Sequence, residues 1–137
     1  MSNEETTETH EHQIPGTISW NELHSQDPES AKSFYSQLFD WEMEEMSIPT
    51  GTYTMFRRGN VPVAGLVKPS ISRIDKPAWM HYVTVAKLED AIEKTQNLGG
   101  SVVMEPTSLP QGRFAVIGDP QGAHVGLYEF GEKPEAY

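Results

Sequence analysis

The feature that most constrains this chain is an internal repeat, in which one order of segments occurs twice, about sixty residues apart. In each copy an alternating, strand-like segment leads into an amphipathic helix, and three further strand-like segments follow. The strand-like segments are 20–27, 41 onward, 52–58 and 61–67 in the first copy, and 80–87, 101–104, 113–117 and 123–128 in the second. The sequence therefore predicts two βαβββ modules.

One such half is too small to bury a sheet face alone, whereas two halves make an ordinary single domain. We expect an α+β fold in which the two modules form a concave cleft, and we expect the functional site in that cleft. The expected boundaries are a disordered acidic tail at 1–14, one domain at 15–131 with modules at about 15–68 and 78–131, a linker at about 69–77, and a C-terminal tail at 132–137.

Composition excludes several classes of function. Ten basic residues against twenty acidic ones give a net charge of −10, which repels nucleic acid and anionic lipid. The chain has no cysteine, so disulfides and thiolate chemistry are absent. No apolar run has the length of a membrane span, and no signal peptide is recognisable at the N-terminus. We expect a cytoplasmic protein with a small-molecule ligand and no nucleic-acid or membrane partner.

The first helix has clear start signals. Asp27 is suited to the N-cap, Pro28 to the first turn, and Glu29 to the positive end of the helix dipole. The second helix is expected to end before two glycines, Gly99 and Gly100. Each helix carries an apolar stripe that we expect to be buried against a sheet. In the first helix this stripe is Ala31, Phe34, Tyr35, Leu38 and Phe39.

Side chains alternate across a strand, so the strand faces opposite the helices are expected to line the cleft. Trp20, Glu22 and His24 share one such face, and Glu22 among aromatic residues is a candidate proton acceptor or donor. Arg113 is placed either to clamp a ligand carboxylate or to lie solvated in its turn. The candidate ligand-binding residues are Trp20, Glu22, His24, Met80, Tyr82, Arg113, His124 and Tyr128.

Several motifs, together with this order of elements, resemble the vicinal oxygen chelate superfamily, which includes glyoxalase I, extradiol dioxygenases and bleomycin-binding proteins. They lie at 27–35, 38–41, 88–92, 98–100 and 119–122, and the resemblance extends over about 16–130. These are scaffold motifs, so they imply the fold and the cleft without selecting a reaction. The resemblance also implies a homodimer.

The resemblance implies four positions for metal ligands, which are commonly His or Glu in this superfamily. These positions fall on Trp20, Met80, Gly126, and either Ala64 or Gly65. None of these residues is a plausible ligand for the cations that this fold holds, so we expect no metal cofactor. A divalent metal remains an alternative if Glu22, His24 and His124 converge.

Three hypotheses follow. The first is a glyoxalase-like domain that lacks the usual metal centre and binds a small apolar or aromatic molecule. The second is a lyase, isomerase or dioxygenase-like enzyme that uses Glu22 as a base or uses the non-standard metal site. The third is a dimeric assembly module. The sequence leaves open whether the protein is an enzyme.

Overall fold

The computed structural model describes residues 13–48, 51–69, 76–109 and 111–131. Most of the expected N-terminal tail, most of the expected linker and the C-terminal tail lie outside these residues. The described residues fall into two compact units. Unit 2 is Asn21–Met80, and unit 1 combines the residues up to Trp20 with those from His81 onward.

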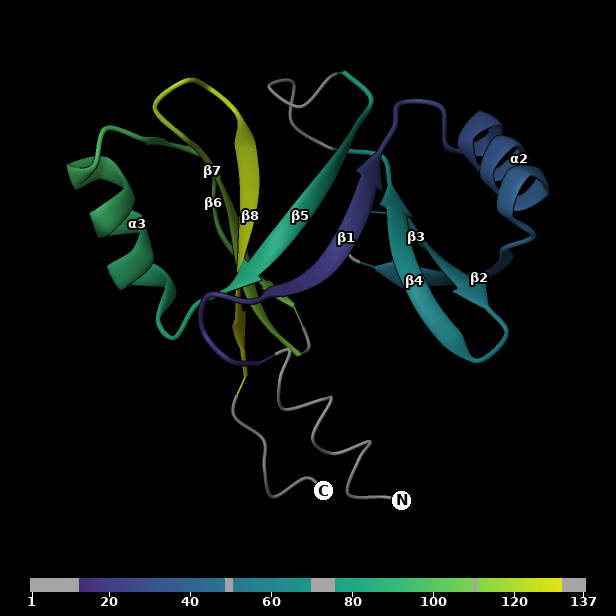
Figure 1. Ribbon diagram of the computed structural model, residues 1–137, viewed down its shortest axis with the longest axis horizontal. Helices are drawn as coiled ribbons and strands as arrows, with labels where there is room; N and C mark the ends of the chain where they lie inside the picture. The colour runs from purple at the N-terminus through teal and green to yellow at the C-terminus, as the bar shows by residue number, and fades with distance from the viewer. Residues whose placement is uncertain (1–12, 49–50, 70–75, 110, 132–137) are drawn as a thin grey trace. The chain divides into compact units, whose positions relative to one another are not determined.

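Unit 2 contains a strand, a helix and three strands, as the repeat predicts (Figure 1). The elements are β1 (Ile18–His24, which starts in unit 1), α2 (Pro28–Phe39), β2 (Glu42–Ile48), β3 (Gly51–Arg58) and β4 (Val61–Val67). The strand order is β2-β3-β4-β1. Strands β1 and β4 are parallel, with Glu22 opposite Gly65, and the other two pairs are antiparallel.

Unit 1 repeats this order, and the repeat predicted from the sequence is confirmed. The elements are β5 (Ala78–Thr84, which starts in unit 2), α3 (Leu88–Asn97), β6 (Ser101–Leu109), β7 (Gly112–Gly118) and β8 (His124–Phe130). The strand order is β5-β8-β7-β6, and β5 runs parallel to β8 with Tyr82 opposite Gly126. The two parallel pairs therefore place a glycine opposite corresponding positions, Glu22 and Tyr82.

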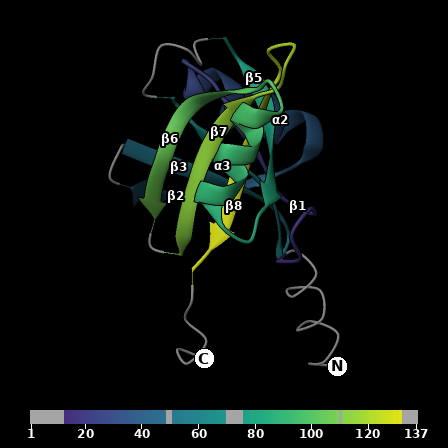
Figure 2. The same ribbon diagram turned by 90° about the vertical axis from the view of Figure 1, so that its left-hand side faces the viewer.

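Each helix covers one face of the sheet in its own unit, and the apolar cores lie beneath the helices. In unit 2, α2 contributes Ala31 and Tyr35 to a core of Leu23, Phe56, Ala64 and Leu66. In unit 1, α3 lies over β7 and β8 (Figure 2), and Leu88 joins Ala115 and Leu127. The α+β fold expected from the sequence is thus the observed one. The predicted cleft between the modules stays a prediction.

The expected buried stripe of α2 is wrong in part. Ala31 and Tyr35 pack on the core, but Phe34, Leu38 and Phe39 are 58%, 56% and 46% exposed. The physical reason is that Ala31 and Tyr35, one turn apart, supply the contact with the sheet, while Phe34 and Leu38 form a neighbouring row about 60° around the helix. The exposed pair Phe34 and Leu38 is called the α2 patch below.

The start of α2 is capped within its own segment. Asp27 is the N-cap, its Oδ1 accepts a hydrogen bond from the backbone N–H of Ser30 at 3.3 Å, and Pro28 opens the helix. These features confirm the predicted start signals. The helix ends at Phe39, and its C-cap residue Asp40 has the left-handed conformation with φ 59°.

Candidate functional site

Two predicted site residues meet at the end of β1. Glu22 and His24 lie on the same face of the strand, and His24 Nε2 is 2.8 Å from Glu22 Oε1. Both residues are buried, with 9% and 4% of their surfaces exposed. The structure therefore brings together the carboxylate and the imidazole that the strand alternation places side by side.

The other ring nitrogen of His24 is exceptional within the described residues. Nδ1 is fully buried and has no hydrogen-bond partner there. A buried polar atom without a partner costs about 1–3 kcal/mol, so such atoms are uncommon away from functional sites. His24 Nδ1 is consequently the polar atom of unit 2 whose burial most needs an explanation.

Beside this pair, a tyrosine ring lies over a glycine. A Cβ added at Gly65 would overlap the hydroxyl and ring of Tyr53. Gly65 is opposite Glu22 on the neighbouring strand, and Met55 is opposite Gly65 on the other side. Alternation along the strands puts Tyr53, Met55 and Gly65 on the same face as Glu22 and His24, away from α2.

Unit 1 shows the same arrangement with more aromatic rings. A Cβ added at Gly126 would overlap the ring of Tyr82, and one added at Gly112 would meet the Tyr128 hydroxyl at 2.9 Å. These two tyrosines are each paired with a phenylalanine. Tyr82 and Phe114 have ring centroids 6.1 Å apart, and Tyr128 and Phe130 have centroids 4.8 Å apart, both edge to face.

These four rings share the face of the sheet opposite α3, because Phe114, Tyr128 and Phe130 alternate with the helix-facing Ala115 and Leu127. They are called the aromatic face below: Tyr82, Phe114, Tyr128 and Phe130. Burial raises the pKa of the Tyr128 hydroxyl above its usual value, so Tyr128 stays protonated at neutral pH. The aromatic face is therefore an uncharged surface that carries phenolic hydroxyls.

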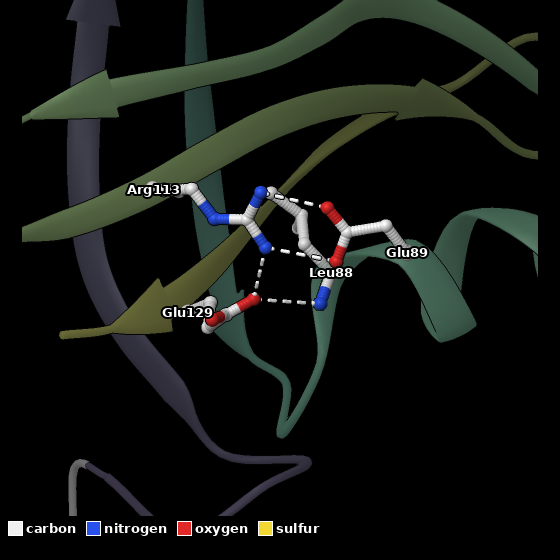
Figure 3. Close-up of polar contacts among 4 residues, drawn as sticks. All are labelled: Leu88, Glu89, Arg113 and Glu129. Atoms are coloured by element: carbon white, nitrogen blue, oxygen red, sulfur yellow. Dashed lines mark hydrogen bonds and ion pairs between the residues drawn. The ribbon is translucent and has the colours of Figure 1, made fainter. Parts of the chain in front are cut away.

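Arg113 lies on the opposite side of its strand from this face. It shares the helix side of β7 with Ala115, and its guanidinium contacts the start of α3 (Figure 3). The two terminal nitrogens bind both oxygens of Glu89 at 2.7 and 2.8 Å, and Nη2 also contacts Glu129 at 2.7 Å. The expected role of Arg113 in ligand binding stays a prediction. The carboxylate that it clamps belongs to the protein itself.

This cluster fixes the charge states of its members. The hydrogen bonds from Arg113 lower the pKa of Glu89 from 4.5 to about 2. The backbone N–H of Leu88, which donates to Glu129 at 2.8 Å, lowers the pKa of Glu129, and Arg113 adds to this effect. Glu129 therefore supplies from β8 the helix cap that Lys87, at the N-cap of α3, does not provide.

The remaining predicted residues are placed separately. Met80 is buried, Trp20 is partly buried and lies two residues before Glu22 on the same face of β1, and His124 is exposed at the first position of β8. Within the described ranges, no three His, Asp or Glu side chains are grouped as a metal ion requires. The absence of a metal cofactor stays a prediction.

Sequence reasoning missed three rings of these faces, Tyr53, Phe114 and Phe130. Each alternates with a helix-facing residue in its strand, so alternation was the available signal. The glycines under Tyr53 and Tyr82 carried a second signal, because glycine inside a strand often marks a place where another group approaches closely.

The fold and these faces define a duplicated βαβββ domain, and comparison with known proteins identifies its family. The family model described as Glyoxalase/Bleomycin resistance protein/Dioxygenase superfamily matches residues 17–127. The chain belongs to this superfamily. A solved structure of a superfamily member from Vibrio splendidus 12B01 superposes with a TM-score of 0.54 at 14% identity, covering 80% of this chain and 96% of that one.

Two relatives are similar in sequence over most of this chain. The putative glyoxylase CFP32 of Mycobacterium bovis is 32% identical, with 83% of this chain and 46% of the relative covered. The anthracycline biosynthesis protein DnrV of Streptomyces peucetius is 29% identical, with 87% of this chain and 43% of the relative covered. The chain thus spans less than half the length of these curated relatives.

No helix in the described part of the chain is both long and apolar enough to cross a membrane.

Proposed function

We propose that this glyoxalase-like domain binds a small apolar or aromatic molecule and lacks the metal centre usual in its superfamily. The observation that carries the proposal is the aromatic face of unit 1. Four rings lie on one side of the sheet, and two of them rest over glycines that leave room for a ring close to the backbone. Aromatic and apolar linings with a few hydroxyls are typical of small-molecule sites.

The state of the implied metal positions supports the second half of the proposal. Gly65 and Gly126 have no side chain to donate, and the space that a side chain would need is occupied by Tyr53 and Tyr82. Trp20 and Met80 offer an indole and a thioether, which do not suit hard or borderline cations. The residues at these positions do not fit the superfamily's metal, so no catalytic step is assigned to one.

The relatives give a class of ligand to test. One of them is named for anthracycline biosynthesis, and anthracyclines contain fused planar rings. Planar rings bind edge to face or offset-stacked against aromatic side chains, which is the contact that the aromatic face offers. We therefore propose a planar, fused-ring compound as the ligand of unit 1.

The test uses the full chain and alizarin, a planar dihydroxyanthraquinone. Alizarin should raise the melting temperature, because a ligand that binds only the folded form stabilises it. Phe114→Leu and Tyr128→Leu should each weaken binding about fivefold, the equivalent of about 1 kcal/mol for one lost aromatic pair. Phe34→Leu, a matched change on the exposed side of α2, should leave binding unchanged. Absence of any shift, or an equal loss with Phe34→Leu, would overturn the proposal.

The Glu22–His24 pair favours a second candidate, a metal-free or non-standard enzyme of the same superfamily. The name of the putative glyoxylase relative points the same way. Metal analysis of protein purified without chelator tests the form of this candidate that uses a non-standard metal site. Stoichiometric metal that is lost in a Glu22→Gln, His124→Ala double variant would support a metal enzyme and contradict the first proposal.

A cytoplasmic homodimer is the third part of the proposal, and the α2 patch supports it. Phe34 and Leu38 expose more than half of their surfaces on one side of α2, which is unusual for large apolar side chains at neighbouring positions. Sedimentation of the wild type against a Phe34→Ser, Leu38→Ser variant should show a dimer that becomes a monomer. A monomeric wild type at all concentrations would exclude this part.

A further inference from the structure

Within the described residues, the buried pair of Glu22 and His24 contains a polar atom whose burial the proposed function does not explain. A carboxylate oxygen can only accept a hydrogen bond, so the 2.8 Å contact requires the proton to lie on His24 Nε2. In a neutral imidazole the other nitrogen then carries a lone pair. Glu22 thus selects one tautomer of His24 and leaves Nδ1 as an acceptor.

The described protein provides no donor for that acceptor. Nδ1 is buried and unpartnered there. The hydroxyl of the next residue, Ser25, accepts a hydrogen bond from the backbone N–H of Asp27 at 3.0 Å. That contact does not use the Ser25 proton, yet the hydroxyl makes no hydrogen bond to Nδ1. Protonating Nδ1 would not remove the problem, because it would bury a donor that is equally unpaired.

We propose that His24 Nδ1 accepts the hydroxyl proton of a phenolic or enolic ligand, and that Glu22 is its positioning residue. Tyr53 and Met55, which share the face, supply apolar surface suited to the ring of a phenol. When the proton moves from the ligand oxygen to Nδ1, the ligand becomes a phenolate or enolate. The resulting imidazolium is then balanced by the Glu22 carboxylate.

This inference goes beyond the proposed function, because it concerns unit 2 by itself and holds whether or not the aromatic face binds a ligand. It names the chemistry of the ligand, an acidic hydroxyl on a flat apolar body. Phenol is the smallest molecule with that chemistry. Anisole is its matched control, because it has the same ring and lacks the hydroxyl proton.

The experiment is nitrogen NMR on full-length protein labelled with ¹⁵N-histidine. Ring resonances distinguish protonated from unprotonated nitrogens, so the free protein should show His24 with Nε2 protonated and Nδ1 bare. Phenol should shift the Nδ1 resonance toward the hydrogen-bonded range, and anisole should not. The exposed His124 serves as an internal control and should respond to neither compound.

Two variants assign the NMR signal to His24 and test the role of Glu22. His24→Gln removes Nδ1 and should abolish the phenol response, while Glu22→Gln offers both a donor and an acceptor to Nε2 and should yield a mixture of tautomers. If either variant fails to fold, backbone-to-ring correlations in the wild type still assign His24. A protonated Nδ1 in the free protein, equal responses to phenol and anisole, or no response to phenol would each overturn the proposal.

Discussion

Helices α2 and α3 occupy the same place in the repeat, but different interactions attach them to their sheets. Helix α2 is capped from its own segment by Asp27, and its Tyr35 lies 6.1 to 6.4 Å from the rings of Trp41 and Phe56. Helix α3 has no N-cap side chain of its own, and in addition to the apolar contacts of Leu88 it is attached by an ionic cluster from β7 and β8. One topology therefore tolerates both an aromatic and an ionic attachment.

The first strands of the two modules also differ, in the side chain that lies opposite a glycine of the neighbouring strand. At corresponding positions opposite a glycine, β1 presents Glu22 and β5 presents Tyr82. The module with the ionic helix attachment has aromatic residues on the face opposite its helix, and the module with the aromatic attachment has the buried acid and imidazole on that face.

The largest expected effect tests the aromatic attachment. Phe56 is fully buried, so Phe56→Ala should lower the free energy of unfolding by about 4 kcal/mol, whereas Leu88→Ala, at the equally buried first residue of α3, should cost about 3 kcal/mol. Urea denaturation measures both. Val61→Ala, at a residue 60% exposed, is the control and should change stability by less than about 0.5 kcal/mol. A larger loss at Leu88 than at Phe56 would reverse the comparison.

A smaller effect separates the two helix caps. Glu129→Ala removes a charged acceptor from Leu88 and Arg113 and should cost about 2 kcal/mol, whereas Asp27→Ala removes one local cap and should cost about 1 kcal/mol. Glu129→Gln keeps an acceptor for Leu88 without the charge and should fall between wild type and Glu129→Ala. The same denaturation experiment checks the order, and equal costs for Asp27→Ala and Glu129→Ala would contradict it.

The smallest effect is a pH dependence of stability that comes from the ionic attachment of α3, the cluster of Arg113, Glu89 and Glu129. Because folding lowers the pKa of Glu89 from 4.5 to about 2, its contribution is complete above pH 4.5 and is lost as the pH falls toward 2. Glu129 acts in the same direction. Melting curves across this range should fall less steeply for Glu89→Gln than for the wild type. Parallel curves would show that the cluster does not contribute to stability.

Local signals predicted much of this fold. The start of α2 at Asp27 and Pro28, the repeated strand order and the shared face of Glu22 and His24 all follow from short-range rules of capping and alternation. Such rules act within a few residues, so they can be applied to a single sequence.

What the sequence did not predict depends on contacts between distant segments. Arg113 meets Glu129 because β7 and β8 pair in one register, and it meets Glu89 because α3 packs over both strands. The exposure of Phe34 and Leu38 depends on how far the sheet extends beneath α2, which periodicity does not report. Tyr53 was overlooked because its glycine partner lies on the next strand.

The boundaries of the two compact units fall inside strands, after Trp20 in β1 and after Met80 in β5. Gly16 donates to Thr84, and Thr84 donates to Thr17, so the residues just before β1 are bonded to the second copy of the duplication. Neither copy contains all the hydrogen-bonding partners that its own strands use. Fragments cut between the copies would therefore need each other to complete these backbone hydrogen bonds.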